Sequence, residues 1–389
     1  MRLWLRKVGG DGDGSVMNLH KFVLVGPILG AVFLILGATP DNPSSGKGIA
    51  SRLSFPYEQG WLGADDAYSV PIGQGKSVWL FGDTFAGDVG NKDRNKTTMV
   101  RNSVAVTTCV TDKPCTIQYF WKNQKTPKPR SFFDTGTDEE WYWPMDGYLD
   151  GDKLYVSLMI VRNKPGAGPT DPFGFEIAGT RWATITNALA PPDQWKFSIK
   201  DLTQKDLWPG SSIVRDGDFV LFYTQASQGE GKGYMIVMRV PVKKMDSPEK
   251  NWEYLGKDGN WNAGLPHGDA QHVIDQAISE MSVRYHPSTK KWVAISPGIE
   301  FPSKRVIART ADSPIGPWSQ PQDVFEFPEM KTTNPIYDKD TFCYATKEHT
   351  EFEDGNVVMT YACNSGVIAK VMNTLELYRP QVVVLDVPK

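Results

Sequence analysis

Gly217-Asp218-Phe219-Val220-Leu221-Phe222-Tyr223, at residues 217–223, joins a tight turn to a short run of aromatic and β-branched residues. The run has no helical period, so it predicts a strand that starts directly after the turn. Four other stretches share this pattern, at residues 75–81, 151–156, 290–295 and 355–361. Successive copies, measured at Trp79, Tyr155, Val220, Trp292 and Val358, are 76, 65, 72 and 66 residues apart. This spacing predicts five similar units, each large enough for a four-stranded sheet with generous loops.

The segments around each copy predict further strands. A strand-like segment precedes every copy, at residues 67–72, 147–149, 212–215, 281–285 and 342–346, and most copies are followed by a third segment. We therefore predict an all-β fold, a five-bladed β-propeller of four-stranded antiparallel blades, over residues 49–389. Radial repetition also leaves few exposed sheet edges. A pair of β-sandwiches or a jelly roll is the structural alternative, but neither predicts five evenly spaced copies.

The composition is that of a globular protein with little net charge. Charged residues make up 22% of the 389 residues and the formal net charge is -3, which argues against nucleic acid as the main partner. Aromatic residues reach 12%, with 13 Trp and 14 Tyr. Their flat apolar faces suit sugar binding, although the alternative is that they fill the core. We expect a monomer whose partner is a carbohydrate polymer.

The N-terminal segment predicts export. Residues 22–38 are an uncharged apolar run preceded by Lys21 and followed by a polar stretch, as in a signal peptide, with residues 1–48 as signal and linker. An uncleaved membrane anchor is the alternative, and it would be the only contact with a membrane. We thus expect a secreted or cell-envelope protein. Four cysteines fall into two close pairs, Cys109/Cys115 and Cys343/Cys363, and favour two disulfides, although reduced buried thiols remain an alternative.

Carboxylates occupy the positions that would face one mouth of a propeller. There, the starts of the first strands and the ends of the second strands share a face. Asp65, Asp66, Asp146 and Glu280 fall at or before first-strand starts, and Asp83 follows a second strand. Like charges at close range raise one another's pKa, which can supply the protonated acid and ionised carboxylate that glycosidic bond cleavage needs. Each acid could instead cap a turn, and adjacent Asp65 and Asp66 would point opposite ways in a strand.

Other chemistries find little support in the sequence. His267 and His272 are spaced as in many surface loops and lack the register or second pair of a metal site. There is no phosphate-binding glycine loop, dinucleotide fingerprint or Gly-x-Ser-x-Gly elbow. We expect no required cofactor and no metal site, and no residue pattern supports a structural calcium ion.

Several phrases resemble a known family. These are residues 60–65 (Gly-Trp-Leu-Gly-Ala-Asp), residues 79–85 (Trp-Leu-Phe-Gly-Asp-Thr-Phe) and residues 101–103 (Arg-Asn-Ser). They resemble the domain-of-unknown-function family DUF4185 and its relatives, and residues 345–349 (Ala-Thr-Lys-Glu-His) are similar to a Lys-x-His segment of these relatives. Residues 313–318 (Ser-Pro-Ile-Gly-Pro-Trp) look like the blade-closing phrase of five-bladed propeller glycosidases. The resemblance implies a propeller glycosidase in which Asp65, Asp83 and Glu280 are the acids. Many relatives carry a small residue after the first Asp, where this chain has Asp66.

The resulting hypothesis is hydrolysis of a glycosidic bond in an extracellular polysaccharide, such as an arabinose-containing polymer. Asp65 and Asp83 would be nucleophile or base, and Glu280 the general acid. Six further residues would orient hydroxyl groups or tune the acids: Asp66, Arg101, Asn102, Asp146, Lys347 and His349. The alternative from another class is a noncatalytic carbohydrate-binding or surface adhesion propeller, and a third is a lyase or transferase that uses the same mouth.

Overall fold

The computed structural model describes residues 48–166, 174–204, 206–227 and 233–388, which lie within one compact unit of residues 46–389. The predicted signal segment therefore falls, except for Gly48, outside the described residues. In the described part of the chain every strand pairing is antiparallel and the single α-helix is α1 (Ile368–Asn373). The predicted all-β class is confirmed.

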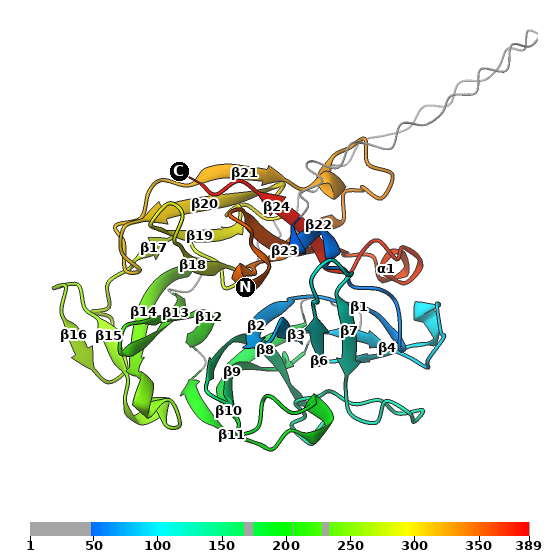
Figure 1. The fold of residues 1–389 in the computed structure, drawn as a ribbon, viewed down its shortest axis with the longest axis horizontal. Helices are drawn as coiled ribbons and strands as arrows, with labels where there is room; N and C mark the ends of the chain where they lie inside the picture. Colours follow the sequence, from blue (N-terminus) through cyan, green and yellow to red (C-terminus); the bar gives the residue numbers. More distant parts are fainter. Residues whose placement is uncertain (1–47, 167–173, 205, 228–232, 389) are drawn as a thin grey trace, which may run out of the picture. The chain divides into compact units, whose positions relative to one another are not determined.

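Six sheets follow one another along the chain (Figure 1). The first two interleave in sequence: β1 (Trp61–Ala64), β4 (Thr84–Ala86) and β5 (Thr98–Val100) form one, and β2 (Tyr68–Gly73), β3 (Lys76–Phe81), β6 (Ser103–Thr108) and β7 (Thr116–Phe120) the other. The next sheet contains β8 (Glu140–Asp150), β9 (Lys153–Asn163), β10 (Phe175–Ile185) and β11 (Phe197–Gln204).

The later three sheets vary in size. The largest contains β12 (Leu207–Asp216), β13 (Phe219–Ser227), β14 (Gly233–Pro241), β15 (Glu253–Leu255) and β16 (Trp261–Ala263), with β17 (Ile274–Asp275) paired to β14. It is followed by β18 (Ser282–His286), β19 (Lys291–Pro297), β20 (Arg305–Ala311) and β21 (Gln322–Glu326). The last contains β22 (Thr341–Glu348), β23 (Val357–Ser365) and β24 (Gln381–Leu385).

Each of the five sequence copies forms the second strand of a hairpin. The pairs are β2–β3, β8–β9, β12–β13, β18–β19 and β22–β23. The turn residues of each copy place its apolar run in register with the preceding strand. The predicted strand before each copy is confirmed.

The expectation of uniform four-stranded sheets is wrong. The sheets have three to six strands, because β15 and β16 extend one sheet and the last one ends at β24. The three-stranded sheet of β1, β4 and β5 was not expected. It forms because the chain leaves β3 at Gly82 and returns along β1, with Thr84 opposite Ala64 and Ala86 opposite Trp61.

The first strands of the five hairpin sheets contact one another in chain order. β2 packs on β8, β8 on β12, β12 on β18, and β18 on β22. Ser69 of β2 also hydrogen-bonds His349, which directly follows β22, at 2.7 Å. The apolar clusters lie between the same neighbours: one combines β2 and β3 with β8 and β9, and another combines β19 and β20 with β22 and β23. Burial between sheets thus fixes how the ends of the first strands are arranged.

Both predicted disulfides are present. Cys109 is bonded to Cys115, and Cys343 to Cys363, which are directly opposite each other in β22 and β23. No helix within the described ranges is long and apolar enough to cross a bilayer.

Candidate carboxylate site

Asp65 and Asp66 lie in the turn between β1 and β2, and both carboxylates face Gly82. A Cβ atom added to Gly82 would be 2.5 Å from Oδ1 of Asp65 and 2.6 Å from Oδ2 of Asp66. These two oxygens are therefore no more than 5.1 Å apart, the sum of those distances. Strand alternation, which would send the side chains opposite ways, does not apply because Asp66 has a φ of 65° and Ala67 of 62°.

Two tyrosines fix the carboxylate of Asp65. Tyr344 and Tyr378 donate their hydroxyls to Oδ2, at 2.7 and 3.0 Å. Asn364 in turn donates to the hydroxyl of Tyr344 at 3.2 Å. Burial raises the pKa of Asp65 well above its usual range, and the charges of Asp66 and Asp83 raise it further. Asp65 is thus held in one orientation and favours its protonated form.

Asp83 is anchored on the opposite side by groups that favour its charge. Arg101 donates from NH1 to Oδ2 at 3.2 Å, and the indole of Trp143 donates to Oδ1 at 2.9 Å. The guanidinium of Arg101 also lies over the ring of Trp141, 4.2 Å from its centroid. Burial raises the pKa of Asp83, while Arg101 opposes this shift. Asp83 is the acid of the group with a direct cationic partner.

Asp66 has a pKa close to neutrality. Burial raises its pKa from 3.8 to about 7, Lys347 lowers it, and the charges of Glu280 and Asp83 raise it. Lys347 is itself buried, its Nζ has no hydrogen-bond partner, and it lies 4.1 Å from the centroid of the Tyr68 ring. Burial lowers the pKa of Lys347. Asp66 can therefore exchange a proton near pH 7.

Glu280 approaches the group from the turn before β18. Its Oε2 accepts the backbone N–H of Ala345 at 2.9 Å. That N–H is available because β22 has a register shift between Tyr344 and Lys347, and Ala345 has a φ of 56°. We call Asp65, Asp66, Asp83 and Glu280 the carboxylate site. These acids come from segments that precede or follow strands of different sheets, as the sequence predicted.

Asp146, a candidate for substrate binding, is instead enclosed. It is 1% exposed, and its oxygens accept the N–H groups of Gly147 and Ile213, both at 2.8 Å. Arg284 completes the set with a 3.0 Å bond to Oδ2. The carboxylate thereby joins β8, β12 and β18, and its oxygens are already occupied. Direct substrate contact does not fit this arrangement.

Two other predicted substrate-binding residues are also buried. Asn102 is 0% exposed, donates to the carbonyls of Phe133 and Tyr142 and accepts the N–H of Phe133. His349 is 0% exposed, with Nδ1 bonded to Ser69 and Nε2 to Thr360. Burial lowers the pKa of His349 well below its usual range, so the ring is neutral. Both residues position strands near the site rather than face it.

Sequence reasoning missed Tyr344, Tyr378, Trp143 and Arg284. Tyr344 could have been found, since it lies in a predicted first strand next to the quoted 345–349 segment. Tyr378 gives no such signal, because it belongs to the irregular segment between α1 and β24 and has a φ of 56°. Contacts made by such a segment depend on the complete fold.

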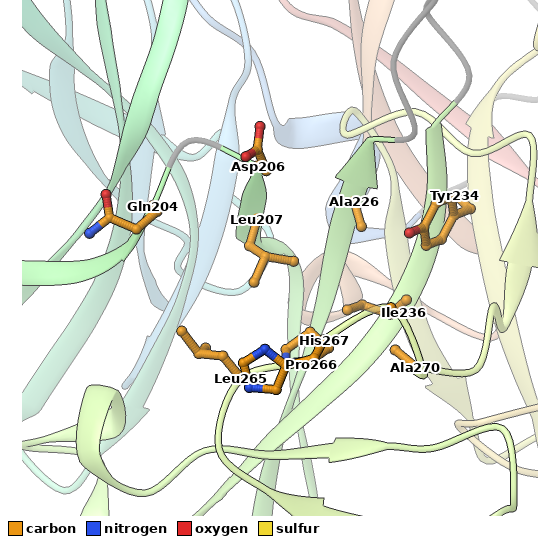
Figure 2. A pocket seen from close by; sticks show the side chains of 11 residues that line it. Gln204, Asp206, Leu207, Ala226, Tyr234, Ile236, Leu265, Pro266, His267 and Ala270 are labelled. Carbon is orange, nitrogen blue, oxygen red and sulfur yellow. The ribbon is translucent and has the colours of Figure 1, made fainter.

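Cavities in the described part of the molecule include one next to Arg101 and one next to His267. One of about 490 Å³ is lined by Arg101 and Trp141, and so adjoins the arginine that binds Asp83; Lys128, Arg130 and Glu140 also line it. The other, of about 350 Å³, is lined by β12 to β14 residues such as Leu207 and Ile236 and by the loop with His267 (Figure 2). None of its lining residues belongs to the carboxylate site. None of the four acids lines the first cavity either, and that cavity reaches the carboxylate site through Arg101.

The arrangement can perform acid–base chemistry. The carboxylate of Asp83 is paired with an arginine, Asp66 has a pKa of about 7, and the carboxyl group of Asp65 is held by tyrosine hydroxyls. Carboxyl groups whose surroundings give them different protonation states can act as acid and base at one pH. Hydrolysis of a glycosidic bond requires such a pair.

Comparison with known families decides the membership of the chain. A model for a domain of unknown function, DUF5005, matches residues 54–386. The chain belongs to the DUF5005 family. The resemblance to DUF4185 that the sequence phrases suggested is therefore wrong as a family assignment. The phrases are short and local, whereas the DUF5005 match extends through nearly all of the described chain.

Individual proteins similar to this DUF5005 member are distant. Notoamide biosynthesis cluster protein J' from Aspergillus versicolor is 27% identical over 204 residues, 49% of this chain and 52% of that protein. The chain thus spans about half the length of that relative. A proposed hydrolase from Bacteroides ovatus ATCC 8483 has a TM-score of 0.67 at 19% identity, over 84% of this chain and 86% of its own. This likeness shows a shared fold.

An α-L-arabinofuranosidase from Lactobacillus brevis is less similar. Its TM-score is 0.46 at 11% identity, with 84% of this chain and 91% of that chain covered. At this level neither sequence nor fold indicates a shared activity. What the DUF5005 chain does must be argued from its own site.

Proposed function

We propose that this DUF5005 protein hydrolyses glycosidic bonds in an extracellular polysaccharide. The observation that carries the proposal is the gathering of Asp65, Asp66, Asp83 and Glu280 into one electrostatically linked group with unequal protonation. Glycosidases use two carboxyl groups in this way, one to protonate the leaving oxygen and one to activate water or attack carbon. An arabinose-containing polymer is one substrate within this class.

The fold we propose for this function is a five-bladed β-propeller. Its support is the sequence of first-strand contacts from β2 through β8, β12 and β18 to β22, and the Ser69–His349 bond between β22 and β2. In such a fold the site lies at one mouth of the axis, where a polymer chain can pass. The cavity beside Arg101 would hold neighbouring sugar rings, because its lining includes Arg101, Lys128 and Glu140, whose charged groups can hydrogen-bond sugar hydroxyls.

Asp83 is our candidate for the ionised carboxylate, acting as base or nucleophile. Its two oxygens receive donors from Arg101 and Trp143, which stabilise the negative charge. Asp66 is our candidate for the general acid because its pKa is about 7. Asp65, which the sequence hypothesis paired with Asp83, takes a supporting role here, since two tyrosine hydroxyls occupy its Oδ2. Glu280, the acid of the sequence hypothesis, lies beside Asp66 and is the alternative proton donor.

Export and the oligomeric state belong to the same proposal. The disulfides Cys109–Cys115 and Cys343–Cys363 support a secreted or cell-envelope location, because disulfides persist in oxidising compartments. We propose that the protein acts there as a monomer on a carbohydrate polymer, with no required cofactor, and that any membrane contact is made through an uncleaved N-terminal segment.

The test is a polysaccharide panel that includes arabinose-containing polymers, assayed for new reducing ends and for polymer binding. We expect the full chain to release reducing ends, and Asp83→Asn to lower the rate by about 10²–10⁴-fold while binding persists. Asp312→Asn serves as the control, since Asp312 pairs with Lys291 at an exposed surface.

Comparing Asp66→Asn with Glu280→Gln identifies the acid. A substrate with a good leaving group, which needs no protonation, should restore turnover in the variant that lacks the acid. Binding by the wild type without release of reducing ends would reject the hydrolase and support a carbohydrate-binding propeller. Unsaturated or transferred products would indicate a lyase or transferase.

A further inference from the structure

A second group of titratable side chains lies at the other ends of the strands that reach the carboxylate site. His286 is the last residue of β18 and Glu348 the last of β22. His286 Nε2 and Glu348 Oε1 are 2.5 Å apart, and Nδ1 of the same ring is 3.8 Å from Oε2 of Glu353. Glu353 directly follows the short 3-10 helix η7 (Thr350–Phe352). One ligand atom from each of the three residues lies within 4.8 Å of the others.

This group is buried and incompletely bonded. His286 is 2% exposed and Glu348 1%, while the side chain of Glu353 is 13% exposed. Oε2 of Glu348 has no hydrogen-bond partner, and neither does Oε1 of Glu353. A carboxylate oxygen that is removed from water without a hydrogen-bond donor loses solvation free energy. The carboxyl groups of Glu348 and Glu353 also hydrogen-bond each other, so a shared proton, and no positively charged partner, lies between them.

The surrounding charges do not supply that partner. Glu351, two residues before Glu353, adds a third acid to the neighbourhood, and its charge acts on Glu353. The nearby cation is Arg284, but its NH2 is directed to Asp146 and its NH1 to Ser212 and Val283. Within the described ranges, the only ion-pair partner of Glu348 or Glu353 is His286.

We propose that His286, Glu348 and Glu353 bind a divalent transition-metal cation, with zinc or manganese the preferred ions. One imidazole nitrogen and two carboxylates form a mixed nitrogen and oxygen ligand set, which suits these ions better than calcium, whose ligands are oxygen atoms. The cation would take the place of the proton shared by Glu348 and Glu353 and would offset the excess of acids. It would also join β18 to β22, which belong to consecutive sheets.

This site is separate from the carboxylate site and independent of the proposed hydrolase. His286 lies four residues beyond Ser282 on β18, about 13 Å at 3.3 Å per residue, whereas Glu348 lies nearer the acids because its backbone N–H donates to Oγ of Ser282 at 3.0 Å. Tyr344 of the carboxylate site and Glu348 have the same four-residue separation on β22. The metal would thus join β18 to β22 through residues that are not among the four acids of the carboxylate site.

The experiment measures metal uptake by the purified full chain. The protein is stripped with a chelator, desalted, and titrated separately with Zn²⁺, Mn²⁺ and Ca²⁺, with bound metal measured by elemental analysis after gel filtration. We expect about one equivalent of Zn²⁺ or Mn²⁺ per chain, and a higher thermal unfolding midpoint when it is bound. Glu353→Gln should weaken uptake by at least about tenfold.

Two comparisons keep the result interpretable. Glu353 is partly exposed, so its amide variant should fold, and circular dichroism checks this. His272→Gln is the matched control, because His272 forms a histidine–carboxylate pair with Asp275 at 3.3 Å but belongs to no three-residue group in the described chain. The control should bind metal like the wild type. Failure of the wild type to bind Zn²⁺ or Mn²⁺ with a Kd below about 100 µM, binding of Ca²⁺ alone, or equal uptake by Glu353→Gln would overturn the proposal. Loss or retention of glycosidase activity would leave this result unchanged.

Discussion

Asp146→Asn should destabilise the fold strongly, because Asp146 is a buried charge with three bonds to three sheets. Its oxygens accept from Gly147 N, Ile213 N and Arg284 NH2 at 2.8, 2.8 and 3.0 Å, and the residue is 1% exposed. An asparagine keeps the volume but has one acceptor oxygen, so its NH₂ group must face at least one of these donors. The guanidinium of Arg284, whose side chain is 15% exposed, also loses its countercharge.

Breaking one partner of a buried ion pair costs about 3–5 kcal/mol, and we expect this loss in the free energy of unfolding. Urea denaturation at constant pH measures it from the transition midpoint and slope. Asp312→Asn is the control: its partner Lys291 is 2.6 Å away, but the two side chains are 85% and 37% exposed. That exposed pair should contribute less than about 1 kcal/mol.

The result also separates the two interpretations of Asp146. If the unfolding free energy of Asp146→Asn is within about 1 kcal/mol of that of the control variant, the structural role of Asp146 is refuted. A variant of unchanged stability that had lost substrate binding would restore Asp146 as a substrate contact.

Three further predictions concern the site and its scaffold. Because the pKa of Asp66 is raised from 3.8 to about 7 in the folded state, the folded chain binds more protons than the unfolded chain between these values, so this residue lowers stability as pH rises through that window. Between about pH 4 and 8, Asp66→Asn should therefore lose less unfolding free energy than the wild type, as measured by denaturant titrations at each pH. An equal dependence of the unfolding free energy on pH in the two proteins would contradict the raised pKa. If Asp66 is the general acid, wild-type activity should also fall above about pH 7. Gly82→Ala should displace the carboxylates of Asp65 and Asp66, whose oxygens would lie 2.5 and 2.6 Å from the new Cβ, and should lower activity by about 10²-fold. Gly366→Ala is the control and should retain activity, because the nearest atom to its new Cβ is 3.9 Å away. Equal activities of the two variants would show that the acids tolerate displacement. Replacing Cys343 and Cys363 by alanine opens a cross-link between residues 20 apart and should lower the unfolding free energy by about 3 kcal/mol, and an unchanged denaturation midpoint would show that the cross-link contributes nothing.

The repeat predicted most of the architecture because each hairpin is locally encoded. Trp79, Tyr155, Val220, Trp292 and Val358 all lie in second strands, each following its turn. Turn residues and apolar runs act over a few positions, so a single sequence displays them. The sheet of β1, β4 and β5 was missed because its strands are only three or four residues long and pair across an intervening hairpin.

The carboxylate site was predicted in part for the same reason. Asp83 and Glu280 follow from their places at strand ends. The relation between Asp65 and Asp66 did not, because positive φ angles at Asp66 and Ala67 replace strand alternation. The burial of Asn102 and His349 was also not evident, since it depends on partners such as Phe133 and Ser69 that lie 31 and 280 residues away. Long-range contacts of this kind leave no local pattern.

The cross-link between β22 and β23 gives the protein a dependence on its route of maturation. Cys343 is the neighbour of Tyr344, whose hydroxyl is 2.7 Å from Asp65. Until the Cys343–Cys363 bond has formed, β22 is held to β23 by hydrogen bonds and packing alone. A chain kept in a reducing cytosol would therefore have a less firmly placed tyrosine. Oxidation of this cysteine pair would be the step that completes the surroundings of the acids.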